Sequence, residues 1–168
     1  VTVDPRAARE RVLYERLMER HKTGEMLSQA LLIPETVQLA PADAEFLTGA
    51  LQRLPCEEYN PNLPVTVELV NPPVIRAQGA PGSISTELVL ARSTATGDPL
   101  RVVTNRRYLA QAIKLGCDQL HIFGPSIPLQ ASTGERVYVW ALLDPDGAIK
   151  PSGKAVRVDS GDAPARTN

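Results

Sequence analysis

The pattern of hydrophobic and polar positions predicts a chain of short helices and strands. Residues 6–20 contain no Pro or Gly, and Leu13 and Leu17 stand four residues apart on one apolar face, which is helical spacing. Pro41 and Asn105 are good starts for two further helices, because Pro fits a first helical turn and Asn can cap one. The sequence therefore predicts three helices.

Between the helices, apolar residues alternate with polar ones, as they do in half-buried strands. Val65, Val67 and Leu69 fall on one side of the clearest run, with polar residues between them. Pro34 interrupts the first run, which favours an edge strand or a bulge there. The predicted strands cover 31–39, 65–70, 74–78, 86–94, 100–103, 119–123, 127–130 and 137–143.

The order of these elements repeats. From residue 31 to residue 143 it reads strand, helix, three strands, and then the same again, so the repeating unit is βαβββ and about 55 residues long. Each helix can cover one face of the strands beside it. We therefore predict an α+β fold of two βαβββ units in a pseudo-twofold arrangement. The predicted organisation is a helical arm at 1–30, this domain at 31–146, and an extended or disordered tail at 147–168.

Composition narrows the class of protein without naming a function. The 168 residues carry 18 Lys and Arg against 19 Asp and Glu, a net charge of −1, which excludes a uniformly basic surface but not a local one. Cys56 and Cys117 form no C-x-x-C pair, which is typical of thiols in a reducing cytoplasm. No apolar run approaches the ~20 residues that span a bilayer. The chain begins without Met and is expected to be part of something longer.

One helix carries a purely basic polar side. Residues 105–116 contain no acid but include Arg106, Arg107 and Lys114, and Arg53 ends the preceding helix. Proteins that hold duplex DNA without reading its sequence do so through Lys and Arg on phosphates. These four residues are therefore the candidate DNA contacts. The alternative is that they are ordinary solvated surface charges.

The second half of the repeat resembles a known family. Residues 100–109 (Leu-Arg-Val-Val-Thr-Asn-Arg-Arg-Tyr-Leu), 119–122 (Gln-Leu-His-Ile) and 137–140 (Val-Tyr-Val-Trp) look like the last half-domain of the bacterial DNA sliding clamp. The resemblance spans about residues 36–143. It implies a clamp fold and a processivity factor that works as a ring around duplex DNA. Residues 141–143 (Ala-Leu-Leu) depart from the family's Met-Pro-Met ending, near the family's peptide-binding cleft.

The start of the chain resembles a second family. Residues 4–15 (Asp-Pro-Arg-Ala-Ala-Arg-Glu-Arg-Val-Leu-Tyr-Glu) are similar to the endonuclease helix of the MutL mismatch-repair C-terminal domain, and the resemblance spans residues 1–51. Gln29, Leu32 and Pro34 match that family's clamp-binding segment. This resemblance implies that they dock on a clamp. If the segment is instead paired in the sheet, Leu31 and Ile33 belong to the core, which is the interpretation we favour.

The endonuclease motif is degenerate, so we predict that the chain is not an enzyme. Arg6 stands where the MutL family has a metal-binding His. Glu10 remains a weak candidate metal ligand, and Glu15 lies about 140° farther round the helix. His21 and His121 are the only histidines and have no ligand partners at metal-binding spacing. We predict no metal and no cofactor; a metal-dependent endonuclease of MutL type is the third alternative.

The leading hypothesis is a non-enzymatic module of DNA replication and repair that holds duplex DNA through its basic helix and tethers partner proteins. The alternative is a MutL-like dimerisation domain that has lost its nuclease site. The expected partners are duplex DNA, replication or mismatch-repair proteins, and further copies of the chain or the rest of a longer one. No membrane partner is expected. The expected location is the cytoplasm. A fusion, a divergent paralogue or a designed sequence would each account for two resemblances in one chain.

Overall fold

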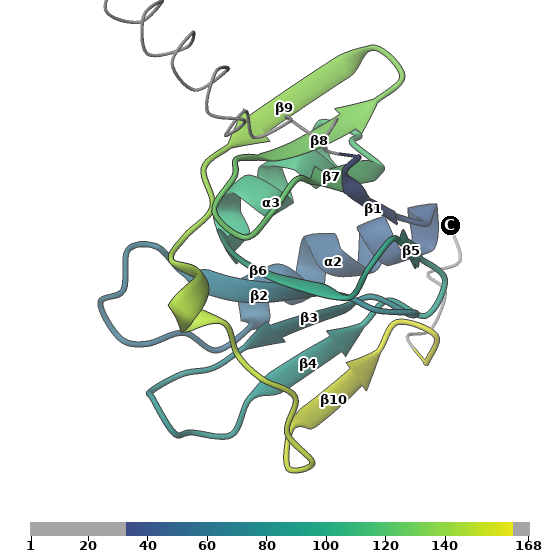
Figure 1. Ribbon diagram of the computed structural model, residues 1–168. Coiled ribbons are helices and arrows are strands. Elements are labelled where there is room, and N and C mark those ends of the chain that lie inside the picture. Colours follow the sequence, from purple (N-terminus) through teal and green to yellow (C-terminus); the bar gives the residue numbers. More distant parts are fainter. Residues whose placement is uncertain (1–32, 163–168) are drawn as a thin grey trace, which may run out of the picture. The chain divides into compact units, whose positions relative to one another are not determined.

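Two five-stranded sheets and two α-helices make up residues 33–162, the part of the chain that this computed structural model describes (Figure 1). The predicted first helix, and with it the arm at 1–30, lies outside the described residues. The helices are α2 (Pro41–Arg53), α3 (Arg106–Lys114) and the short 3-10 turn η1 (Pro145–Gly147). The strands are β1 (Glu35–Gln38), β2 (Pro64–Leu69), β3 (Val74–Ala77), β4 (Thr86–Val89), β5 (Thr94–Thr96), β6 (Leu100–Asn105), β7 (Gln119–Ile122), β8 (Leu129–Thr133), β9 (Arg136–Trp140) and β10 (Val156–Asp159).

Both predicted helices begin where the sequence places them. α2 starts at Pro41, which occupies its first turn. At the start of α3 the Asn105 side chain accepts a hydrogen bond from the backbone N–H of Arg107 at 2.8 Å, so the predicted cap is confirmed. Gly116 follows α3 with a φ of +82°, a conformation that favours glycine and ends the helix.

The predicted repeat is confirmed, and its two halves exchange their first strands. The halves are β1-α2-β2-β3-β4 and β6-α3-β7-β8-β9. Sheet A runs β5-β1-β7-β8-β9, and sheet B runs β10-β4-β3-β2-β6. β1, from the first half, pairs antiparallel with β7 of the second, and β6 of the second half pairs antiparallel with β2 of the first. The pseudo-twofold arrangement therefore interlocks the halves, and neither sheet is complete without both of them.

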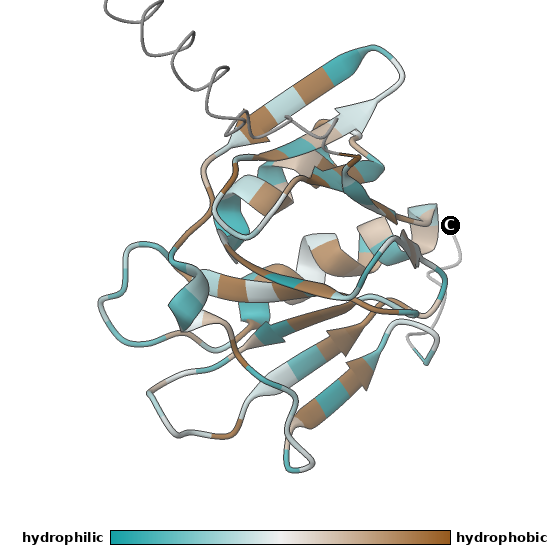
Figure 2. Ribbon diagram, viewed as in Figure 1, coloured by the Kyte–Doolittle hydropathy of each residue, from teal (hydrophilic) through white to brown (hydrophobic). Residues whose placement is uncertain are grey.

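A single apolar core joins the two sheets and the two helices. Hydropathy alternates along several strands (Figure 2), and apolar residues of both sheets belong to this core. Leu47 and Leu51 of α2 and Leu109 of α3 are each at most 1% exposed, and they share this core with Val67 of sheet B and Leu120 of sheet A. The two helices also pack against each other. The apolar faces of the two helices and of the two sheets are thus buried in one core.

Some strand boundaries differ from the prediction. The predicted strand 86–94 ends at Val89, because a turn in which Ser93 N–H bonds the Leu90 carbonyl intervenes before β5. β1 begins at Glu35, after Pro34 rather than through it. β8 runs on to Thr133, since the hairpin closes through only two residues, 134 and 135.

Residues 147–162 lie against the domain, in the stretch where we predicted an extended or disordered tail. β10 pairs with β4 in parallel and adds a strand to sheet B. Ahead of it, the backbone N–H of Ile149 donates to Thr66 Oγ1 at 2.8 Å, so this segment crosses the outer face of the sheet. The sequence contains little sign of β10, because the strand is four residues long and two of them, Arg157 and Asp159, are charged.

A buried carboxylate ties the C-terminal strand to α2. Asp43 is 0% exposed and accepts hydrogen bonds from Ser93 Oγ at 2.6 Å, Ser160 Oγ at 2.6 Å and the backbone N–H of Arg92 at 3.0 Å. These donors come from the turn before β5 and from the residue after β10. Asp43 also lies in the first turn of α2, where the helix dipole favours an acid. One side chain therefore holds three distant segments together.

We predict that Asp43→Ala lowers the free energy of unfolding by about 3 kcal/mol, because it leaves three donors, two of them buried serine hydroxyls, without an acceptor. The matched control is Glu45→Ala, two residues farther along the same helix at an exposed position, which should change it by less than about 0.5 kcal/mol. Urea unfolding of both variants measures the difference. Equal effects would show that the Asp43 network contributes no stability of its own.

Candidate nucleic-acid interface

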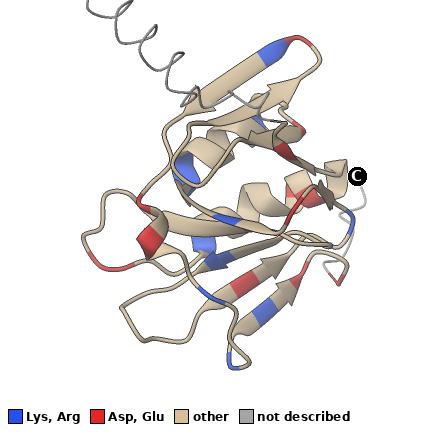
Figure 3. Cartoon of the chain, viewed as in Figure 1, with Lys and Arg blue, Asp and Glu red and all other residues tan. Residues whose placement is uncertain are grey.

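The exposed side of α3 is basic and free of acids. Arg107, Gln111 and Lys114 are exposed at helical spacing along one face of the helix. The opposite face, including Leu109 and Ile113, is buried in the core. Figure 3 shows the Lys and Arg positions of α3 and the acids elsewhere on the chain. α3 thus presents two cations to solvent on a rigid element.

α2 carries a third exposed cation, near the start of α3. Arg53 lies in the last turn of α2 and is exposed. The end of α2 adjoins the start of α3, because Arg106 Nη1 donates to the carbonyl of Leu54 at 2.5 Å. Asp43 is buried, so Glu45 is the one exposed acid of α2. Toward solvent the helix pair therefore carries three cations against one acid. We call Arg53, Arg107 and Lys114 the basic helix surface.

Arg106 does not belong to this surface, and its prediction as a DNA contact is corrected here. The residue is 8% exposed, and its guanidinium is committed to the Leu54 carbonyl. Its own backbone N–H bonds the carbonyl of Leu63. Arg106 thus joins the end of α2 and the segment before β2 to the start of α3. A pattern of charge alone cannot separate such a structural cation from its exposed neighbour Arg107.

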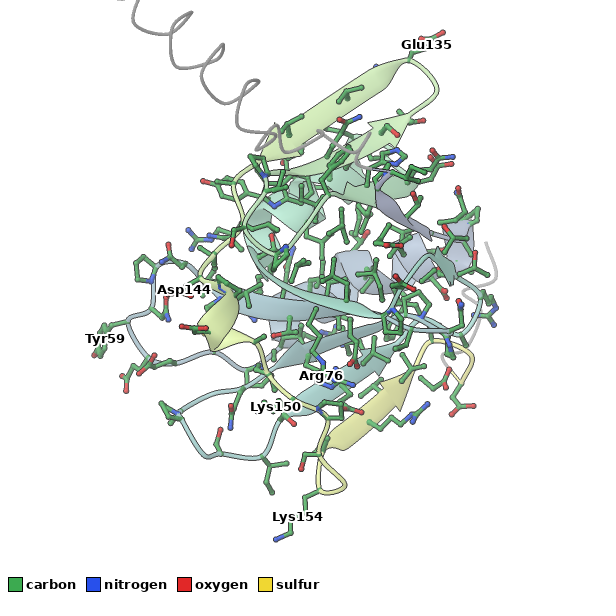
Figure 4. The ribbon with its side chains drawn as sticks, in the orientation of Figure 1. Tyr59, Arg76, Glu135, Asp144, Lys150 and Lys154 are labelled. Atoms are coloured by element: carbon green, nitrogen blue, oxygen red, sulfur yellow. The ribbon has the colours of Figure 1, made fainter. Side chains whose placement is uncertain are left out.

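A second cluster of charges lies on the outer face of sheet B, and the sequence patterns did not indicate it. Arg76 Nε is 2.6 Å from Glu87 Oε1, and Arg76 Nη1 is 2.5 Å from Glu68 Oε2, at an angle outside hydrogen-bond geometry. Arg101 Nε donates to Glu68 Oε1 at 2.5 Å. Arg76 lies under residues 147–162, here called the C-terminal segment, which include Lys150 (Figure 4). Two acids and two bases neutralise each other here, so the cluster offers no free charge to a ligand.

The C-terminal segment also borders an open groove of about 390 Å³. The groove lies between the loop before β4, which includes Ser83 and Ser85, and the stretch from Asp146 to Lys154. Lys150 and Lys154 line it and are exposed (Figure 4). The groove could not be predicted from the sequence patterns, because one of its walls was expected to be a tail.

Of the residues proposed to bind a clamp, Gln29 and Leu32 lie outside the described part of the chain, as does the weak metal candidate Glu10. Pro34 is half-buried and directly precedes β1. Ile33 is 86% exposed, so the expectation that it belongs to the core is wrong. β1 begins at Glu35, two residues after Ile33, and Leu31, the other residue of that expectation, lies outside the described residues.

Within residues 33–162 no three His, Cys, Asp or Glu side chains are grouped so that they could hold a metal ion. His121 Nε2 lies 2.8 Å from Ser132 Oγ, a contact that joins β7 to β8. Cys117 is buried, and burial raises the pKa of its thiol, with a smaller contribution from Asp118. Over the same residues, none of the helices has the length and apolar character required to cross a membrane.

The fold described above is that of a DNA sliding clamp domain. The polymerase III subunit beta of Pseudomonas aeruginosa superposes with a TM-score of 0.55 at 16% identity, over 73% of this chain and 34% of that one. The sliding clamp of Bartonella birtlesii bound to griselimycin gives a TM-score of 0.54 at 18% identity, over 67% of this chain and 31% of that one. At these identities the likeness is one of fold.

The first third of the chain is similar to a different family. Residues 1–55 match the model of the MutL C terminal dimerisation domain. MutL of Phenylobacterium zucineum is 44% identical over 54 residues, which are 32% of this chain and 9% of that protein. MutL of Caulobacter vibrioides is 43% identical over 54 residues, 8% of its length. The chain therefore matches less than a tenth of each of these relatives. Both resemblances in the sequence are confirmed, and they overlap on β1 and α2.

The two neighbouring arginines of α3 should behave differently. We predict that Arg106→Gln lowers the free energy of unfolding by about 2 kcal/mol, because the buried Leu54 carbonyl loses its donor. Arg107→Gln keeps the backbone N–H that donates to the Asn105 side chain. It should change the free energy of unfolding by less than about 0.5 kcal/mol. Denaturant unfolding compares the pair. A stable Arg106→Gln variant would contradict the structural role given to Arg106.

Proposed function

We propose that this chain is a self-associating, non-catalytic module of DNA mismatch repair, in which a MutL-like dimerisation segment is built into a clamp-like domain. The observation that carries the proposal is where the match to MutL overlaps the clamp-like fold. The match to the MutL dimerisation domain ends at residue 55, just beyond α2, and β1 and α2 contribute Val37, Leu47 and Leu51 to the core of the clamp-like fold.

This function is the alternative named from the sequence, and it is better supported than the leading hypothesis. The similarity to sliding clamps supports the fold, at 16–18% identity, whereas the similarity to MutL extends to sequence. That the chain is not an enzyme stays a prediction, motivated by Arg6 in place of a metal-binding His. Manganese-dependent nicking of DNA that is abolished by Glu10→Ala would overturn it.

Self-association is tested by the mass of the full chain in solution. A monomer has a mass of 18.2 kDa, and we predict a dimer of twice this mass that dissociates on dilution. Sedimentation equilibrium over a hundredfold range of concentration measures it. A single monomeric species throughout that range would remove the proposed function.

A second candidate function, contact with duplex DNA, is favoured by the basic helix surface. Its three cations lie on two packed helices, and α3 carries no acid. Lys and Arg on such a surface bind phosphates without reading sequence. The contact would help to hold a repair module on DNA.

We predict that the triple variant Arg53→Gln, Arg107→Gln, Lys114→Gln weakens binding to duplex DNA. The slope of log affinity against log salt should fall by about 0.9 for each phosphate that the variant no longer neutralises. The control triple is Lys150→Gln, Lys154→Gln, Arg157→Gln, which removes the same charge from exposed positions of the C-terminal segment. Fluorescence anisotropy at several salt concentrations compares them. Equal weakening would mean that the effect follows net charge and not the helix surface.

A further inference from the structure

Within residues 33–162, β9 ends sheet A with an open edge. It pairs with β8 alone, in a hairpin whose closing pair is Thr133 and Arg136. Hydrogen-bonded and non-hydrogen-bonded pairs alternate along such a ladder. The closing pair is hydrogen-bonded, so the backbone N–H and C=O groups of Val137 and Val139 point away from β8. The side chains of these two valines are 62% and 55% exposed.

Of the other three edges, those of β5 and β6 each have backbone groups bonded by another segment, and that of β10 carries charged side chains. On β5, the Asn71 side chain bonds both the N–H and the carbonyl of Ala95, at 2.7 and 2.8 Å. On β6, the Val103 carbonyl accepts from the backbone N–H of Leu143. β10 covers the edge of β4 and carries the charges of Arg157 and Asp159. Charged residues and short strands discourage further pairing.

β9 lacks these protections between Val137 and Trp140. The four residues Val-Tyr-Val-Trp contain no charge and no proline. By the pseudo-twofold relation between the halves, β9 corresponds to β4, which already has β10 as a neighbour. An exposed, uncharged, apolar edge of this kind is a template for pairing with another strand. Among the described strands, β9 is the one whose edge is open and apolar.

We propose that β9 pairs with β9 of a second copy of the chain, antiparallel, about a twofold axis at Tyr138. This inference rests on the proposed self-association and names the surface responsible for it. In that register Val137 faces the partner's Val139, Val139 faces the partner's Val137, and the two Tyr138 residues are opposite each other. The two five-stranded sheets then join into one continuous sheet.

The strand is complementary to itself in this register, and this is the register in which both valines of each strand face valines of the other; a shift by two residues places one of them opposite Glu135 or Ala141. The outward N–H and C=O groups of Val137 and Val139 meet the same groups of the partner, which gives hydrogen-bonded pairs on both sides of the axis. A shift by one residue would oppose backbone groups that point back toward β8. The valine side chains gather on one face as apolar cross-strand pairs.

Charge does not oppose the pairing. Arg136 falls opposite the partner's Trp140, and Glu135, at the tip of the hairpin (Figure 4), falls opposite the partner's Ala141, so no two like charges face each other. The edge is short, and a small interface of this kind is reversible when it acts alone. The association should therefore depend on concentration.

The first test compares three single variants of the full chain by sedimentation equilibrium. Val137→Lys and Val139→Lys each place a charge on the β9 edge, and we expect no dimer at concentrations where the unaltered chain dimerises. The control is Val156→Lys on β10, at a position 56% exposed against 55% for Val139, which should leave the dimer intact. Urea unfolding confirms that all three variants are folded.

The second test fixes the register. A Val137→Cys chain and a Val139→Cys chain are mixed and oxidised. The proposed register places these positions opposite each other, at a Cα separation of about 5.5 Å, which suits a disulfide. We expect a cross-linked dimer from the mixture and only the background of the native cysteines from either chain alone. A mixture that dimerises without cross-linking would overturn the register.

The outcomes separate this inference from the function on which it rests. If the unaltered chain is a monomer, both the proposed self-association and the β9 pairing are wrong. If the chain dimerises and Val137→Lys and Val139→Lys leave the dimer unchanged, only the β9 pairing is wrong, and the proposed function stands on another surface. Cross-linking in the mixture together with dissociation of the dimer in both lysine variants supports the inference.

Discussion

The exchange of first strands between the two halves of the repeat is the constraint on which the rest of the structure depends. β1 completes the sheet of the second half, and β6 completes that of the first. Each half alone would leave an unpaired strand and an uncovered apolar face, so the halves fold together or not at all.

The exchange of strands bears directly on the two family resemblances of the chain. The segment from residue 34 to residue 55 that matches MutL supplies a central strand and a core helix to the clamp-like domain. A boundary between a repair segment and a clamp segment therefore cannot fall there as a flexible linker.

Buried polar groups then determine how the remaining segments attach to this core. Asp43 brings the turn before β5 and the residue after β10 to the start of α2, and Arg76 neutralises two glutamates beneath the C-terminal segment. Such groups are costly to bury unless each has a partner. They therefore favour one placement of the C-terminal segment over all others. The same segment covers β4 with the charged strand β10, and Leu143 ahead of it donates to β6, which leaves β9 as the open edge without charges between Val137 and Trp140.

The sequence predicts the repeat and both helix starts, because periodicity and capping are local properties that Pro41, Asn105 and Gly116 express directly. It does not predict β10, since the apolar and charged alternation there lasts only four residues and the partner strand lies about 70 residues away. The position of Arg106 along the helix does distinguish it from an exposed cation. It stands three and seven residues before Leu109 and Ile113, on the face of α3 that is buried, and this spacing separates it from Arg107. The Asp43 network and the charge cluster of sheet B could not be predicted, because their partners come together only in the folded chain.

The central claim is that the MutL-like segment 34–55 and the clamp-like remainder form one folding unit. Native-state hydrogen exchange of the full chain tests it most directly. We predict that the core amides of β1 and α2 exchange through the same opening as those of β6 and β7, with free energies that agree within about 1 kcal/mol and fall together as denaturant is added. Exchange of β1 and α2 through a separate opening, several kcal/mol below that of β6 and β7, would contradict the claim.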